Sequence, residues 1–191
     1  MDKLFTSVSF WVIVVLVLLV LWIVKTANKL ARKKMKAEQA FADVDVFLTQ
    51  RYDLIPNLVS TVKGYSKHEK ETFEAVVKAR NSAVSAGSMN DKIDADNNVT
   101  EAIGKLFALA EAYPELKANE NFVKLQDSLE SVEKDLVGAR RYFNAAAQAY
   151  NLAIAIIPDF IVAKIFGYKA MSVFTATEEQ RKNVKVDFSE E

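Results

Sequence analysis

The stretch YFNAAAQAYNLAIAII, residues Tyr142 to Ile157, contains no charged residue, although 26% of this 191-residue chain is charged. It is a candidate for a second membrane span, for a buried helix, or for a contact between copies of the protein. As an α-helix it would reach about 24 Å, and it keeps Asn144, Gln148 and Asn151, so it is too short and too polar to cross a bilayer. The stretch therefore predicts a helix that is covered by protein on all sides, either by its own domain or by other subunits.

A seven-residue repeat runs through this stretch and through the charged sequence before it. Large apolar residues recur at intervals of seven, and a second row of apolar residues fills the companion positions. The repeat predicts one long fourth helix. The large residues are Phe122, Leu129, Leu136, Phe143, Tyr150 and Ile157, and the companions are Leu125, Val132, Ala139, Ala146 and Ala153.

The amino-terminal segment Leu4 to Val24 predicts a transmembrane helix. It holds 21 residues between Lys3 and Lys25, which as a helix cover about 30 Å, the thickness of the hydrocarbon core of a bilayer. Trp11 and Trp22 lie near its two ends, where aromatic residues anchor spans at the membrane surface. The alternative is a cleaved signal peptide, but the segment is longer than the usual apolar region of about 7 to 15 residues and its flank is barely basic.

A basic collar follows the span, and an acidic body follows the collar. From Ala37 onward, 18 Lys and Arg stand against 24 Asp and Glu, so the body has no surplus of positive charge for nucleic acid. Positive flanks are retained in the cytoplasm, which predicts a cytoplasmic body. The collar is also expected to bind anionic lipid headgroups. Its cations are Lys25, Lys29, Arg32, Lys33, Lys34 and Lys36.

The first helix of the body is expected to continue the span to about Tyr65. Apolar positions step by three and four residues, and their phase survives Pro56, which indicates one kinked helix. Lys34 and Arg51 occupy two positions of this stripe. Its apolar members are Leu30, Ala37, Phe41, Val44, Leu48, Ile55, Leu58, Val62 and Tyr65.

Two further helices are expected before the fourth. The second begins near His68 or Glu69, and its stripe is Phe73, Val77, Arg80 and Val84. The Gly, Ser, Asn and Asp residues from Ser85 to Asn98 predict the longest loop of the body. The third helix begins around Asn97 or Asn98, carries Val99, Ile103, Leu106 and Ala110, and ends at a turn that contains Pro114.

The predicted fold class is all-α. Five glycines and three prolines are too few for a turn-rich sheet protein, and four helices with apolar stripes suggest an antiparallel four-helix bundle. The expected segments are a transmembrane helix (1–25) continuous with the bundle, a basic juxtamembrane collar (26–36), the helical bundle (37–170) and an extended polar tail (171–191).

The sequence resembles the LemA family of bacterial membrane-anchored helical proteins. The resemblance rests on RYDLIPNLVSTVKGYSKHE, YPELKANENFVKLQDSLE, AR with FN and AYN in the fourth helix, then FGY and VKVDF. It implies one amino-terminal span in the bacterial cytoplasmic membrane, a helical-bundle body and no established catalytic activity. The chain is also similar, more loosely, to magnetosome-membrane relatives implicated in shaping or organising membrane.

Several polar residues fall on apolar stripes and predict a polar cluster inside the bundle. They are either satisfied core groups that set helix register or the lining of a site for an anionic or polar ligand, and the first interpretation is favoured because buried ionic groups need partners in any case. The cluster comprises Arg51, Asn57, Arg80, Arg140, Asn144, Gln148 and Asn151.

The sequence offers no catalytic or cofactor motif, so no enzyme activity, metal or cofactor is expected. There is no cysteine, and a single histidine, His68, excludes the two Glu-x-x-His pairs of a di-iron bundle. Glu69 adjoins His68, but neighbouring side chains on a helix point apart. No nucleophile elbow, phosphate loop or dinucleotide fingerprint is present.

The apolar segment Phe160 to Tyr168 is an amphipathic helix on the membrane, a cap on the bundle, or a subunit contact. Apolar surface beyond the need of one bundle favours a homo-oligomeric scaffold, and the alternative is an adaptor or ligand-binding module that uses the polar cluster or the loop from Ser85 to Asn98. No protein partner is identified. The expected oligomer contacts are Tyr150, Ile154, Ile157, Phe160, Ile161, Ile165 and Phe166.

Overall fold

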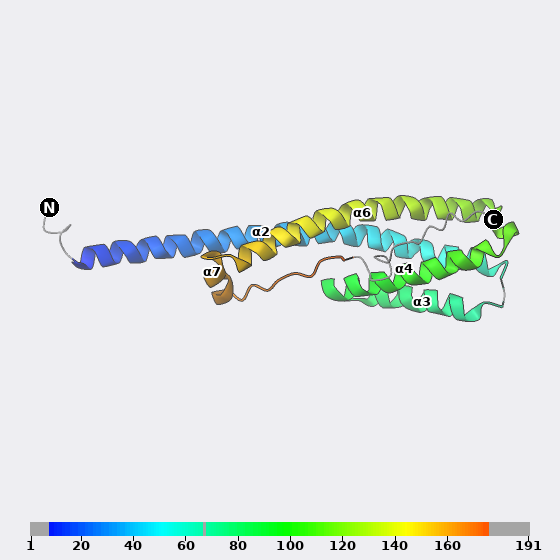
Figure 1. Cartoon of the computed structure of the whole chain (residues 1–191), viewed down its shortest axis with the longest axis horizontal. Coiled ribbons are helices and arrows are strands. Elements are labelled where there is room, and N and C mark those ends of the chain that lie inside the picture. The colour runs from blue at the N-terminus through cyan, green and yellow to red at the C-terminus, as the bar shows by residue number, and fades with distance from the viewer. Residues whose placement is uncertain (1–7, 67, 176–191) are drawn as a thin grey trace, which may run out of the picture. The chain divides into compact units, whose positions relative to one another are not determined.

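The computed structural model describes residues 8–66 and 68–175. All regular structure among these residues is helical, which confirms the all-α prediction (Figure 1). The expected residues 4–7 of the span and 176–191 of the tail lie outside the described residues. The helices are α2 (Val8–Lys63), α3 (Lys70–Ser85), α4 (Met89–Glu111), α5 (Pro114–Lys117), α6 (Glu120–Ala155) and α7 (Asp159–Ile165).

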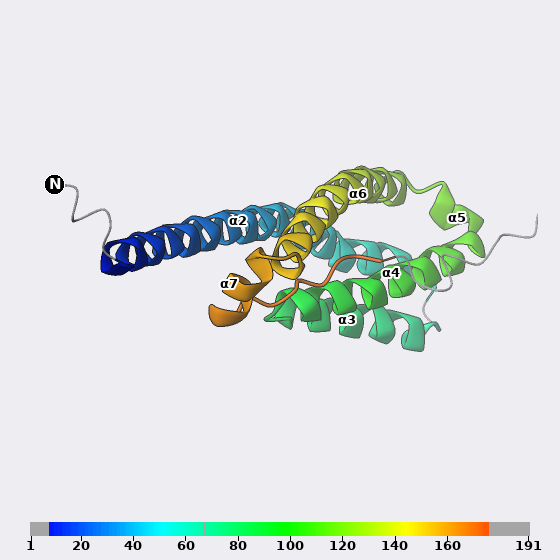
Figure 2. The ribbon, with the colours of Figure 1, turned by 60° about the vertical axis from the view of Figure 1, so that its left-hand side comes forward.

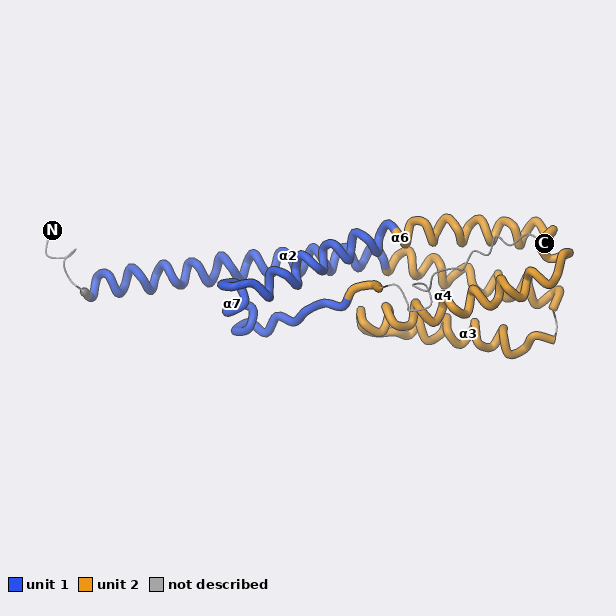
Figure 3. Tube along the Cα trace, in the orientation of Figure 1, with its two compact units in different colours: residues 1–44, 138–172 blue, residues 45–137, 173–191 orange. Residues whose placement is uncertain are grey.

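The chain forms two compact units, which Figure 3 distinguishes by colour. Unit 1 comprises residues 1–44 and 138–172, and unit 2 comprises residues 45–137 and 173–191. Both α2 and α6 contribute to each unit. Within unit 2, α3 and α4 lie side by side (Figure 1 and Figure 2).

The first part of α2 is long and apolar enough to cross a membrane, and among the described residues no other single helix is. Apart from Val14, its large apolar side chains between Trp11 and Leu21 are about half exposed. A helix in the core of a soluble protein would have these side chains covered by the chain itself. The α6 and α7 pair would qualify only as a broken span, since the two helices are bent by 93°.

The second part of α2 carries the expected stripe. Every apolar member from Leu30 to Val62 is buried, and Arg51 is buried in phase with them. The helix continues through Pro56 and ends at Lys63, so Tyr65 follows the helix and is exposed. One periodic apolar face therefore continues from the end of the candidate span through residue 62.

The predicted stripe of α3 is wrong at two of its four positions. Val77 is 42% exposed and Val84 is 55% exposed, whereas Val76 and Ala83 are buried together with Phe73. The prediction chose Val84 because it is larger than its neighbour Ala83, but the buried face passes through the alanine. It also chose Val77 in place of its neighbour Val76, and Val77 lines a surface groove instead.

The predicted loop from Ser85 to Asn98 is also wrong, because α4 already begins at Met89. The Ser88 side chain caps this helix and accepts a hydrogen bond of 3.1 Å from the backbone N–H of Asp91. Ser and Asp at these two positions form a helix-start signal, and an acidic residue in the first turn is stabilised by the helix dipole. The polar residues therefore form the first turns of α4. The predicted apolar stripe of α4 from Val99 to Ala110 is buried as expected.

The large residues of the seven-residue repeat form a seam along α6 that is buried from Phe122 to Tyr150, whereas the companions Leu125, Val132 and Ala139 are only partly buried. The seam fails at Ile157, which lies beyond the end of α6 and is 82% exposed. Pro158 explains this end, because a residue that precedes proline is disfavoured in the helical conformation. The turn expected around Pro114 contains the short helix α5, whose Leu116 is buried.

Candidate functional site

Unit 2 buries one arginine almost completely: Arg51 on α2, whose side chain is 2% exposed. Its Nη1 donates to Asp96 Oδ1 at 2.8 Å and to Thr100 Oγ1 at 3.0 Å, both on α4. Its Nε lies 2.5 Å from Glu133 Oε1 on α6. One side chain thus connects three helices of unit 2.

This arrangement neutralises Arg51 within the chain. Asp96 is as buried as the arginine, and Glu133 is partly exposed, so two carboxylates face one guanidinium. A surplus of negative charge around the guanidinium repels an anionic ligand. The geometry therefore supports the interpretation of Arg51 as a group that sets helix register.

The other two members of the predicted cluster in unit 2 lie apart from these contacts. Arg80 on α3 is partly exposed, donates from Nε to the backbone oxygen of Tyr52 at 3.4 Å, and lies 4.0 Å from Asp53. Asn57 is exposed, so it does not lie inside the bundle as predicted. Arg80 therefore ties α3 to α2, and Asn57 faces solvent.

The remaining four members belong to unit 1. Arg140, Asn144 and Asn151 are partly buried, whereas Gln148 is exposed. Asn151 makes two hydrogen bonds with the backbone of Met171: its Nδ2 donates to the carbonyl oxygen, and its Oδ1 accepts from the N–H, each at 2.8 Å. Asn151 thus fastens the extended segment that follows α7 to α6.

Tyr150 completes this attachment. Its hydroxyl donates to the backbone oxygen of Lys169 at 2.9 Å, and its ring meets Tyr168 edge to face. Burial raises the pKa of the Tyr150 hydroxyl, and the nearby Tyr168 and Glu38 raise it further. A tyrosine hydroxyl is protonated at neutral pH in any case, and the raised pKa keeps this one protonated, and able to donate, further into the alkaline range.

Gly167 turns the chain toward this attachment. Its φ is 70°, in the left-handed region that favours glycine. The N–H of Tyr168 donates to the oxygen of Ala163, and the N–H of Gly167 donates to the oxygen of Lys164, which is the hydrogen-bond pattern of a Schellman C-cap. The FGY and AYN motifs therefore cooperate to end α7 and hold residues 168–171 against α6.

Replacing Asn151 with alanine is expected to release this segment. Loss of two hydrogen bonds, each worth about 0.5 to 1.5 kcal/mol, should speed hydrogen exchange at the Met171 amide by about tenfold or more. Exchange measured by mass spectrometry on a peptide that covers residues 168–175 tests this. Gln148→Ala, an exposed change one turn earlier, should leave the exchange unchanged, and equal rates in both variants would contradict the assignment.

The cations of the collar are not equivalent in the structure. Lys29 pairs with Asp159 on α7 at 2.6 Å, Lys34 lies 3.6 Å from Glu38, and Lys36 lies over the ring of Tyr142. Lys25 and Arg32 are exposed, and Lys33 is partly buried. The collar therefore contributes to packing within unit 1 as well as to surface charge.

The residues expected at oligomer contacts divide into two groups. Tyr150 and Ile154 are buried in a cluster formed by their own chain, where they pack with Leu30, Val162 and Ala163. The other five are exposed: Ile157, Phe160, Ile161, Ile165 and Phe166. Tyr150 and Ile154 of α6 thus receive cover from α2 and α7.

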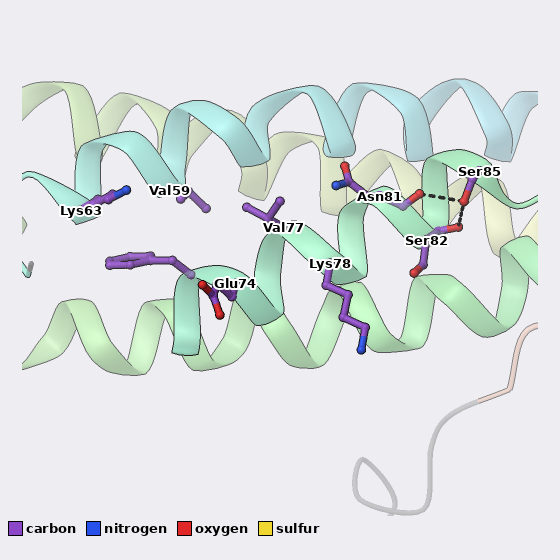
Figure 4. A pocket seen from close by; sticks show the side chains of 9 residues that line it. Val59, Lys63, Glu74, Val77, Lys78, Asn81, Ser82 and Ser85 are labelled. Carbon is purple, nitrogen blue, oxygen red and sulfur yellow. Dashed lines mark hydrogen bonds between the residues drawn. The ribbon is translucent and has the colours of Figure 1, made fainter. Parts of the chain in front are cut away.

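A surface groove of about 580 Å³ lies between α2 and α3 in unit 2. Figure 4 shows Val59 of α2 and Val77 of α3 along it, together with the charged side chains of Lys63, Glu74 and Lys78. A second hollow shares Val59, Lys63 and Val77 with the first. The groove combines an apolar lining with a charged border.

Sequence reasoning missed one further polar contact. The side-chain oxygen of Asn119 accepts from the N–H groups of Asn121 and Phe122 and so caps α6, while its Nδ2 donates to the hydroxyl of Tyr65. Asn immediately before a helix was an available signal for the cap.

Within residues 8–66 and 68–175, no group of three His, Asp or Glu side chains is placed to hold a metal ion.

Comparison with known proteins gives a consistent family. The family description that matches this chain is LemA family, over residues 40–188. Magnetosome protein MamQ of Magnetospirillum gryphiswaldense is 25% identical, with 72% of this chain and 60% of the relative covered. Magnetosome protein MamQ 2 of Paramagnetospirillum magneticum is 24% identical, with 70% and 58% covered. Protein LemA of Metamycoplasma hominis is 22% identical, with 85% and 74% covered.

The chain thus spans about three fifths of the length of the MamQ relatives that it matches. None of these names denotes an enzyme. The matched range begins at Ala40, so the apolar first part of α2 lies outside the family match.

Proposed function

This chain belongs to the LemA family, and from this premise we propose that it is a membrane-anchored structural scaffold that self-associates at the bacterial cytoplasmic membrane and organises that membrane. Its body in this proposal is an antiparallel four-helix bundle attached to a single span. The observation that carries the proposal is the continuity of α2, whose bare apolar first part leads without a break into a buried stripe.

The span supplies the anchor, and the collar sets the orientation. Insertion into a bilayer stabilises an exposed apolar helix of this length by about 25 cal/mol for each Å² of apolar surface that is transferred from water to lipid. The cations after Val24 favour a cytoplasmic body. Labelling of a cysteine placed at Ser128 by an impermeant reagent added outside intact cells would contradict this orientation.

Self-association is supported by one exposed face of α6. In unit 1 this face carries Gly138, Tyr142, Ala145, Ala149 and Leu152, which recur at intervals of four and three residues and are all exposed. Small residues in such a stripe let the backbone of a second helix approach closely. The same face in unit 2 is polar, with Lys124, Ser128, Ser131 and Asp135. The contact between copies is therefore proposed for the unit 1 half alone.

A glutamate at the centre of this stripe is expected to abolish assembly. Ala149→Glu would place unpaired negative charges in the contact, and the dissociation constant should rise by more than about tenfold, since desolvating such a charge costs several kcal/mol. Sedimentation of the detergent-extracted protein and cross-linking in native membranes measure the change.

Ser131→Glu is the matched control, because it adds the same charge to the same helix face in its polar half. It should leave assembly intact. If the unmodified protein sediments as a monomer at its membrane concentration, or if Ala149→Glu assembles as well as the unmodified protein, self-association through this stripe is excluded.

A second candidate function is that of a membrane-tethered adaptor, and the groove between α2 and α3 favours it. The groove joins an apolar lining to cations and an acid at its border, which suits an amphipathic helix of a protein partner. A Val77→Glu variant that assembles normally but no longer recovers a partner captured by the unmodified protein would support the adaptor function over the scaffold.

A further inference from the structure

The short helix α7 is apolar on both of its faces. Its inner face places Val162 and Ala163 in the buried cluster of unit 1. Its outer face and flanks are exposed, with Ile161 at 50% and Ile165 at 67%. We call these exposed residues the outer apolar surface of α7; they are Ile157, Phe160, Ile161, Ile165 and Phe166.

The position of α7 along α2 places this surface at the end of the candidate span. The cluster that buries Val162 and Ala163 also contains Leu30, and Trp22 and Ile23 pack against it. Trp22 and Ile23 belong to the apolar first part of α2, and Leu30 lies only about 9 Å further along the helix than Val24. The headgroup region on each side of a bilayer is about 5 to 8 Å thick.

An ion pair holds α7 at this depth. Lys29, one turn beyond the span, contacts the nearly buried carboxylate of Asp159 in the first turn of α7. This pairing leaves Lys164 as the remaining charged side chain of α7, and it is exposed. A helix with an apolar surface and an exposed lysine suits the boundary between acyl chains and headgroups.

We propose that the outer apolar surface of α7 is embedded in the membrane interface beside the anchor, so that lipid covers it. The proposal rests on the proposed anchoring of α2 and adds a second membrane contact to it. Trp22 and Ile23, which pack against the cluster on the inner side of α7, lie in the part of α2 that the bilayer surrounds in the anchored state. A second copy seated on α7 would have to displace the lipid around the end of the span, whereas the stripe of α6 leaves room for that copy elsewhere.

The absence of cysteine from the chain allows single nitroxide labels to test this on the full-length protein. Cysteines replace Ile161, Ile165, Leu18 and Ser128 one at a time, and each labelled protein is reconstituted in vesicles of phosphatidylcholine and phosphatidylglycerol. Collision rates with oxygen, which concentrates in lipid, and with a water-soluble nickel chelate are then measured. The oxygen-to-nickel ratio at Ile161→Cys and Ile165→Cys is expected to be several-fold higher than at Ser128→Cys, and highest at Leu18→Cys.

Each alternative has its own pattern. A high ratio at Leu18→Cys with values at Ile161→Cys and Ile165→Cys equal to that at Ser128→Cys would overturn the α7 proposal and leave the anchor standing. Low collision rates with both reagents at α7, with spectral broadening between labels, would assign the surface to a second copy and also overturn it. A low ratio at Leu18→Cys would refute the anchor, and the inference about α7 with it.

Discussion

Replacing Arg51 with methionine is expected to lower the free energy of unfolding by about 3 to 5 kcal/mol, the usual effect of removing one partner from a buried ion pair. Methionine fills a similar volume, so the loss is mainly electrostatic: the buried Asp96 and the nearby Glu133 lose the cation that balances them. Urea unfolding of the full-length protein in detergent, followed by far-ultraviolet circular dichroism, measures the change.

Arg80→Met provides the matched comparison. Its partner Asp53 is exposed and 4.0 Å away, and the hydrogen bond of Arg80 to the backbone oxygen of Tyr52 is long, at 3.4 Å. Solvated ion pairs of this kind contribute about 0 to 1 kcal/mol, so the loss should be clearly smaller than for Arg51→Met. A folded Arg51→Met protein with unchanged stability and assembly would show that the arginine does not set helix register. Partial recovery of stability when Asp96→Asn is added to Arg51→Met would locate the penalty in the uncompensated carboxylate.

Phe143→Ala alone is expected to lower the free energy of unfolding by about 3 to 5 kcal/mol, because it removes a fully buried aromatic side chain and leaves a cavity. Phe143 lies in the seam of α6 and meets Phe41 of α2 edge to face, with ring centroids 5.3 Å apart. Both residues belong to unit 1, so the loss should be largest there. Hydrogen exchange resolved along α2 and α6 would show whether protection is lost first in residues 138–155.

Val137→Ala is the control for cavity formation on the same helix. Val137 is half exposed, and exposed substitutions of this kind usually change stability by no more than about 0.5 kcal/mol. Equal destabilisation by the two variants would mean that the buried seam does not carry the packing of unit 1.

The helices could be predicted from the sequence wherever large apolar residues keep a helical period. The stripe from Leu30 to Val62 and the seam from Phe122 to Tyr150 are of this kind, and their phase alone identified the buried faces. The prediction failed where small or polar residues carry the structure. On α3, Ala83 is buried where the prediction had placed Val84. On α4, Ser88 caps the start of a helix within a sequence whose composition is typical of a loop.

The polar contacts were less predictable, since most depend on where the chain returns. Arg51 was identified because its position interrupts an apolar stripe, and its partners Asp96 and Glu133 could not be identified by the same reasoning. Asn151 was expected in an interior cluster, but its partner is the backbone of Met171, twenty residues later. That contact requires the turn at Gly167, which periodicity does not encode.

The continuity of α2 through the collar gives the basic residues fixed directions. Lys25, Lys29, Arg32 and Lys36 follow one another at intervals of four, three and four residues, so they lie on one face of a single helix. In the anchored state, attraction to anionic headgroups is consequently stronger on this face of α2 than on the others, and it tilts the helix so that this face turns toward the membrane. The molecule then tilts with a fixed rotation about its own helix axis, so that every copy turns the same flank toward the headgroups before copies touch.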